Sequence, residues 1–129
     1  MAFIIRLIIV VLLAATMPSI QSNPVNQNSL LTSHKGREIA RKSCETACTL
    51  YRSATNSNPI ICNCNMMEKA TMQTKLMDGN GILVEIYLRF LGTMNGLRVE
   101  ISLTFCTKVN GHDKKIWVKD IKIVHDREL

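Results

Sequence analysis

The sequence predicts an α+β domain in which one N-terminal helix packs on a four-stranded antiparallel meander sheet. Between Gly36 and about Ala54, apolar residues recur at helical spacing. After Pro59 they instead alternate with polar residues, in runs separated by hairpin-length loops. A helix and a sheet that are each apolar on one side bury those sides against each other. Four cysteines between Cys44 and Cys64 further predict that the helix is clamped to the first strand.

These cysteines are spaced as C-x3-C, then thirteen residues, then C-x-C. Residues four apart share a helix face and residues two apart share a strand face, with similar axial separations of about 6 Å and 6.6 Å. The strand follows the helix directly and runs antiparallel to it, so the cysteines nearest the turn should pair. The expected disulfides are therefore Cys48–Cys62 and Cys44–Cys64.

Zinc is the alternative for these thiols. The spacing suits it poorly, and a secreted chain oxidises its cysteines, so we expect neither a metal nor a cofactor. Over the 21 residues from Cys44 to Cys64, the pattern resembles the cystine-stabilised helix of endothelins, scorpion toxins and defensins. That resemblance implies the disulfide geometry and no activity.

Residues 1–22 have the composition of a secretory signal peptide. Arg6 provides the positive charge, the apolar run Leu7–Ala15 is too short to span a bilayer, and cleavage is expected after Ser22, with Ser19 as the rival site. We therefore predict a secreted, extracellular protein with no stable membrane span. Residues 23–35 should form a flexible arm, and residues 36–129 a single disulfide-stabilised domain.

Helix and strand limits follow from caps, turns and alternation. Thr32 or Ser33 can cap the helix. The first strand is expected to begin at Ile60 and to have a break near Met67. The other three are expected at Ile82–Leu91, Leu97–Cys106 and Ile116–Val124. A bulge at Lys119–Asp120 in the last strand would put its apolar residues on one face: Ile116, Val118, Ile121 and Ile123.

The register of the central hairpin should be set by charge. Core-facing residues must meet each other, and among the registers that satisfy this, one sets Arg89 opposite Glu100. We therefore expect Arg89 to face Glu100 and Phe90 to face Val99. A helix followed by an antiparallel meander resembles the cystatin-like layout, by analogy of architecture alone. The glutamine-valine-glycine hairpin signature of cystatin inhibitors is absent from Met77–Gly81.

Cys106 is the odd cysteine of the five, and alternation places it on the sheet face away from the helix. It can be an unpaired thiol shielded by Leu30 and Leu31 of the arm. It can instead form an intermolecular disulfide that makes a homodimer. No partnering base is placed beside it, so thiol catalysis is not expected.

Basic residues gather near the C-terminus, at Lys114, Lys115, Lys119, Lys122 and Arg127. They can form a patch for an acidic surface, or they can be edge-strand lysines that oppose aggregation. Trp117 is the only aromatic residue among these basic residues, which disfavours a nucleic-acid-binding function because such surfaces stack bases on several aromatic side chains.

Nothing in the chain carries a catalytic motif. No phosphate-binding glycine loop, nucleophile elbow or metal-binding histidine pair occurs, and Glu85 and Glu100 are typical of solvated strand charges rather than of an acid/base pair. The sequence favours a small non-enzymatic binding or signalling protein that acts on an extracellular protein or acidic surface. The alternatives are a cationic host-defence or membrane-active protein and a secreted enzyme inhibitor.

Overall fold

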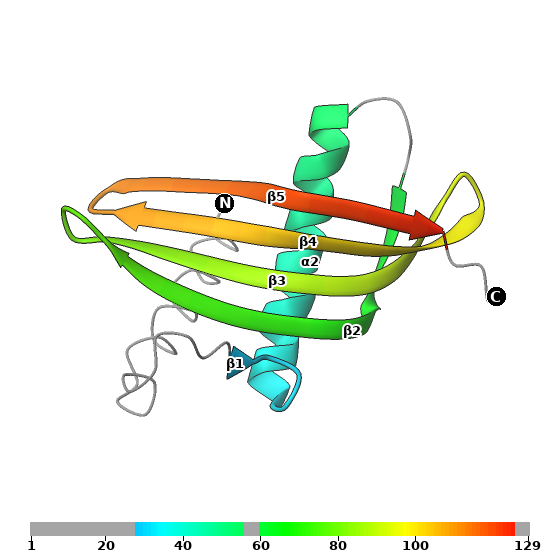
Figure 1. The fold of residues 1–129 in the computed structure, drawn as a ribbon, viewed down its shortest axis with the longest axis horizontal. Helices are drawn as coiled ribbons and strands as arrows, with labels where there is room; N and C mark the ends of the chain where they lie inside the picture. Colours follow the sequence, from blue (N-terminus) through cyan, green and yellow to red (C-terminus); the bar gives the residue numbers. More distant parts are fainter. Residues whose placement is uncertain (1–27, 56–59, 126–129) are drawn as a thin grey trace.

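A computed structural model describes residues 28–55 and 60–125. It shows one helix, α2 (His34–Thr55), packed on a five-stranded antiparallel sheet. The strands follow the order of the chain: β1 (Asn28–Ser29), β2 (Ile60–Met77), β3 (Gly81–Met94), β4 (Leu97–Asn110) and β5 (Asp113–His125). In Figure 1 the helix crosses steeply behind the sheet, and no other element of the described residues covers the opposite face. The α+β prediction and the disulfide clamp are confirmed, with one strand more than expected.

The extra strand, β1, comes from the segment predicted to be a flexible arm. Asn28 and Ser29 pair with Met72 and Thr71 of β2, and the Leu30 amide donates a 2.9 Å hydrogen bond to the Ala70 carbonyl. Leu30 is only 5% exposed because its side chain enters the core between the helix and the sheet. For residues 28–33, the expectation of a flexible arm is therefore wrong. His34 and Lys35, also placed in the predicted arm, form the first turn of α2. Residues 23–27 of the arm, the signal peptide and its cleavage site lie outside the described residues.

The helix begins where a capping residue was expected. The Gly36 amide donates a 2.9 Å hydrogen bond to the Ser33 hydroxyl, which satisfies one of the unpaired donors of the first turn. The buried stripe consists of small residues and cysteines at helical spacing, which lets the helix approach the sheet closely: Ala40, Cys44, Ala47 and Cys48. Ile39 extends this stripe toward the start of the helix.

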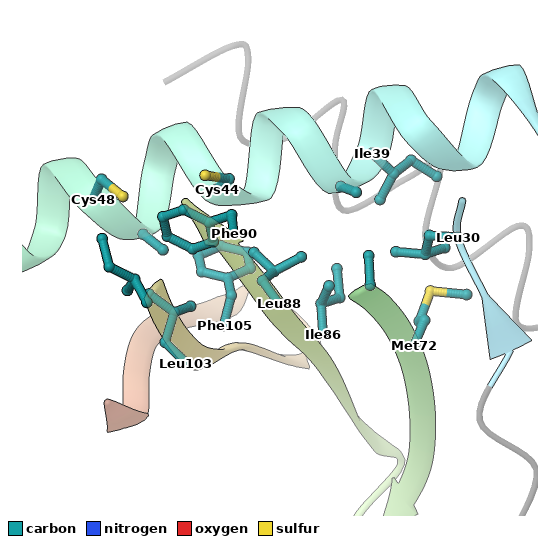
Figure 2. Close-up of a cluster of buried hydrophobic side chains, with 14 of the residues drawn as sticks. Leu30, Ile39, Cys44, Cys48, Met72, Ile86, Leu88, Phe90, Leu103 and Phe105 are labelled. Atoms are coloured by element: carbon teal, nitrogen blue, oxygen red, sulfur yellow. The ribbon is translucent and has the colours of Figure 1, made fainter. Parts of the chain in front are cut away.

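The core lies between this stripe and the alternating inward residues of the sheet. Phe90 of β3 and Phe105 of β4 occupy its centre under the helix, beside Leu88 and Leu103 (Figure 2). All four are at most 2% exposed. The predicted alternation of β3 and β4 is thus confirmed as a buried face and an outer face.

The register of the central hairpin differs from the charge-based prediction. Arg89 lies opposite Ser102 and Phe90 opposite Ile101, whereas Glu100 lies opposite Leu91. Both strands extend farther than expected, to a two-residue turn at Asn95 and Gly96 with φ of 54° and 78°. Positive φ at both central residues is the type I′ pattern, which Asn-Gly adopts readily and which matches the twist of the flanking strands. The turn therefore fixes the register, and the weak attraction between exposed charges does not.

Two irregularities were expected and are present. The register of β2 shifts around Met67, and that of β5 shifts between the partners of Ser102 and Thr104, where Asp120 has a φ of 55°. The β5 bulge brings Ile116, Val118 and Ile123 against the core. Ile121, expected with them, remains 39% exposed.

Candidate functional site

The outer face of the sheet, which no described element covers, carries lysine and arginine side chains from four strands. In one cationic row across the sheet, Lys75 of β2, Lys108 of β4 and Lys115 of β5 lie level with Leu83 of β3. A second row crosses through Ser102 and consists of Lys69, Arg89 and Lys122. The rows meet β3 six residues apart, which corresponds to about 20 Å along a strand. We call these six residues, together with Lys119 between the rows, the outer cationic surface.

A shallow groove of about 450 Å³ lies in this surface, within the size range of small-ligand pockets. Its lining comes from all four strands and contains no aliphatic side chain: Lys69, Thr71, Gln73, Lys75, Glu85, Tyr87, Thr104, Lys119 and Asp120. The Lys69 ammonium lies 5.9 Å from the centre of the Tyr87 ring, so the ring helps to hold that charge at the groove. The groove thus presents ammonium groups among hydroxyl and amide groups.

Glu85 holds two of these ammonium groups. Its side chain is 11% exposed, and its oxygens lie 2.9 Å from Lys75 Nζ and 2.5 Å from Lys119 Nζ. The hydrogen bonds from Lys119 and Lys75 lower the pKa of the Glu85 carboxyl, and the bond to Glu85 raises the pKa of Lys119. Because one carboxylate neutralises only one of two ammonium groups, this cluster keeps a positive charge.

We predict that Glu85→Gln destabilises the protein by about 1 kcal/mol at neutral pH, since two charge-assisted bonds are lost. The folded-state pKa of Glu85 lies below its ordinary value of 4.5, so its contribution exists above that value. It disappears as the pH falls through the folded-state pKa. Urea unfolding of the wild type and the variant should show a stability difference at pH 7 that shrinks progressively as the pH falls below 4.5. Glu100→Gln, on the same face, is the matched control, and a difference that does not shrink as the pH falls would contradict the ionic explanation.

The basic patch predicted near the C-terminus is divided by the fold. Lys115, Lys119 and Lys122 lie on the outer face, whereas Lys114 lies opposite Val109 on the helix side of the sheet. Arg127 lies outside the described residues. Sequence analysis missed the cations that complete the surface from other strands: Lys69, Lys75, Arg89 and Lys108. Alternation alone places Arg89 and Lys108 on the Cys106 face, but aligning them with β2 and β5 requires the register.

Glu85 and Glu100 are also separated by the register. Glu100 lies opposite Leu91, six residues along β3 from Glu85, or about 20 Å. At that separation the two carboxyls cannot act on one bond, since an acid/base pair needs both groups within about 10 Å.

Cys106 lies on the outer face, as alternation predicted, and is a free thiol with no exposed area. Glu85 and Trp117 are its direct neighbours on the two adjacent strands. Leu30 and Leu31, which were expected to shield it, instead pack in the core on the helix side. The side chains that shield the Cys106 thiol therefore belong to the outer face of the sheet. Burial is the main cause that raises the pKa of the Cys106 thiol.

We predict that Cys106 is alkylated slowly in the folded protein, because burial and a raised pKa both reduce the reactive thiolate. An iodoacetamide time course should show modification at least about a hundredfold slower than in urea. A disulfide to a second copy would require this region to open. Rapid alkylation under native conditions, or a dimer on non-reducing electrophoresis that Cys106→Ser abolishes, would contradict the shielded thiol.

The other four cysteines form the expected clamp, with disulfides between Cys44 and Cys64 and between Cys48 and Cys62. The sulfurs of Cys44, Cys48 and Cys64 lie within 4.8 Å of one another. A sulfur bound in a disulfide is not the thiolate that zinc requires. The clamp joins the helix to the start of β2 and so fixes the sheet that carries the outer cationic surface.

Within residues 28–55 and 60–125, no helix is both long and apolar enough to cross a membrane, because α2 has 22 residues but a polar composition. Comparisons with protein-family models, with curated proteins and with solved structures found no match. The candidate site is therefore interpreted from its own chemistry.

Proposed function

We propose that this protein is an extracellular, non-enzymatic binding protein whose outer cationic surface engages an acidic macromolecule. One observation supports this most strongly. Of the seven cations of the outer cationic surface, three line the polar groove and four share its face of the sheet, which no described element covers. Two disulfides are compatible with an oxidising extracellular compartment. A rigid sheet presents such charges in a fixed pattern and attracts oppositely charged partners over long range.

Protection of an exposed sheet edge explains only part of this charge. Lysines on the outermost strand β5 can oppose edge-to-edge aggregation, and the β5 bulge does the same. Arg89 and Lys108, however, lie on β3 and β4, which are flanked by strands on both sides. Arg89 contacts Glu68, with 4.0 Å between Nε and Oε1, and Lys108 forms no ion pair among the described residues. Edge protection does not explain cations on these inner strands, whereas binding of an acidic partner across the sheet does.

The solvent side of the helix is also basic, but its charges are arranged differently. Arg41 pairs with Glu45 and Lys42 with Glu38 along the helix axis. Such i,i+4 pairs stabilise the helix itself. The helix therefore provides a matched control, because substitutions there change the net charge without changing the outer cationic surface.

The test uses two triple variants with the same change in net charge. The row variant is Lys69→Ala, Lys108→Ala and Lys122→Ala, which leaves the Glu85 cluster intact. The control variant is Lys35→Ala, Arg52→Ala and Lys114→Ala, which removes charges from the helix and the opposite side of β5. Three acidic probes are titrated: a linear sulfated polysaccharide, vesicles of phosphatidylcholine and phosphatidylserine, and polyglutamate.

We expect the wild type to bind at least one probe with an affinity that falls as salt is added, because exposed charges are screened. The row variant should weaken that binding by at least about tenfold, and the control variant by less than about threefold. Absence of binding to all three probes, or equal losses in both variants, would overturn the proposed function.

A further inference from the structure

We propose, building on the function proposed above, that the acidic partner is a linear sulfated polysaccharide that lies along the polar groove and contacts both cationic rows. The two rows are separated along the strands, and Lys119 lies between them, level with Thr104 and Tyr87. A single phosphate or sulfate ion is smaller than the separation of about 20 Å and reaches only one row. A chain with charges repeated along its length reaches both.

The groove lining favours a sugar polymer over the other acidic partners. Thr71, Gln73 and Thr104 offer hydroxyl and amide groups that can donate to and accept from sugar hydroxyls. Protein interfaces have an apolar, aromatic-rich centre from which lysine is depleted. Membrane-binding surfaces combine basic residues with inserted apolar side chains, whereas the groove contains no aliphatic residue. Among the described residues, the most exposed aliphatic side chain, Leu76, lies opposite Ile82 on the helix side of the sheet. Trp117 and Val124 are the exposed apolar residues of β5 on the outer face, and both lie outside the groove lining.

Ion pairs with Glu85 hold Lys75 and Lys119 in place and leave N–H donors of both lysines available to such a ligand. An ammonium group has three N–H donors, and the bond to Glu85 uses one donor from Lys75 and one from Lys119. Both lysine side chains remain about half exposed, at 51% and 43%. Their remaining donors can bond sulfate oxygens, and the carboxylate reduces the entropy that these long side chains lose when a ligand binds.

The experiment measures affinity by calorimetry for a series of sulfated oligosaccharides whose lengths lie below and above about 20 Å. The affinity should increase with length until a chain spans both rows. It should then level off, after correction for the number of positions at which a longer chain can bind. The chemically desulfated polymer of the same length should bind at least about tenfold more weakly. The row variant should lose the dependence on length, because both rows are depleted, and the control variant should retain it.

The outcomes separate this inference from the function on which it rests. Binding to phosphatidylserine vesicles or polyglutamate with no binding to the sulfated series would overturn the polysaccharide and leave the acidic-partner function in place. Equal affinity for sulfated and desulfated chains, or affinity independent of length, would also overturn the polysaccharide inference. Failure of every probe would overturn both proposals.

Discussion

The variant Phe90→Ala should lose about 3–5 kcal/mol of the free energy of unfolding, the usual cost of deleting a buried aromatic side chain. Phe90 has no exposed area and lies under the helix beside Phe105 (Figure 2). Its partners on the adjacent strands, Ile101 and Met67, have paired backbones, so the surrounding structure can relax only partly into the space. Urea unfolding followed by circular dichroism measures this change.

The matched control is Leu97→Ala, because Leu97 is apolar but 59% exposed at the start of β4. We expect this variant to stay within about 0.5 kcal/mol of the wild type, as surface substitutions usually do. If Phe90→Ala cost less than about 1 kcal/mol, the packing of the helix on the centre of the sheet would be incorrect.

Removing one disulfide should cost about 3 kcal/mol, mainly because the unfolded chain gains freedom. The two disulfides close similar loops, with sequence separations of 20 and 14 residues, so the double variants Cys44→Ala/Cys64→Ala and Cys48→Ala/Cys62→Ala should lose similar amounts. Denaturant unfolding of each against the wild type gives the values. The crossed pairing in a non-reducing peptide map, or unchanged stability in both variants, would contradict a helix clamped to β2.

The main features of the fold were readable from the sequence because each depends on short-range patterns. Helical spacing identified α2, strict alternation identified β3 and β4, and the C-x3-C and C-x-C spacings matched the periods of a helix and a strand. These signals agree because the apolar positions that recur in the sequence are the positions that become buried in the fold. The signal peptide and cleavage site stay predictions.

The features that were predicted wrongly from the sequence depend on small energy differences between competing local interactions. A two-residue strand such as β1 has too few residues to show alternation, and only its pairing with Thr71 and Met72 reveals it. The central register was assigned from charge, but the Asn95–Gly96 turn outweighed it, because backbone conformation constrains every pair along the hairpin.

The candidate site was only partly predictable for the same reason. Lys115, Lys119 and Lys122 are close in sequence and were recognised as a basic cluster. Lys69 and Arg89 belong to the surface because β2 pairs with β3 across the irregularity near Met67. A cationic row across several strands is a consequence of register, which a single sequence without an alignment specifies poorly.

The most direct test of the outer cationic surface is the rate at which each lysine is acetylated, with and without the sulfated polysaccharide. Peptide mass spectrometry of the wild-type protein reports the lysines one by one. Binding should slow acetylation of Lys69, Lys75, Lys108, Lys115, Lys119 and Lys122, and should leave Lys35 on the helix and Lys114 on the opposite side of β5 unchanged. Protection of Lys35 and Lys114 to the same extent, or no protection of the outer lysines, would contradict the assignment of this face as the binding surface.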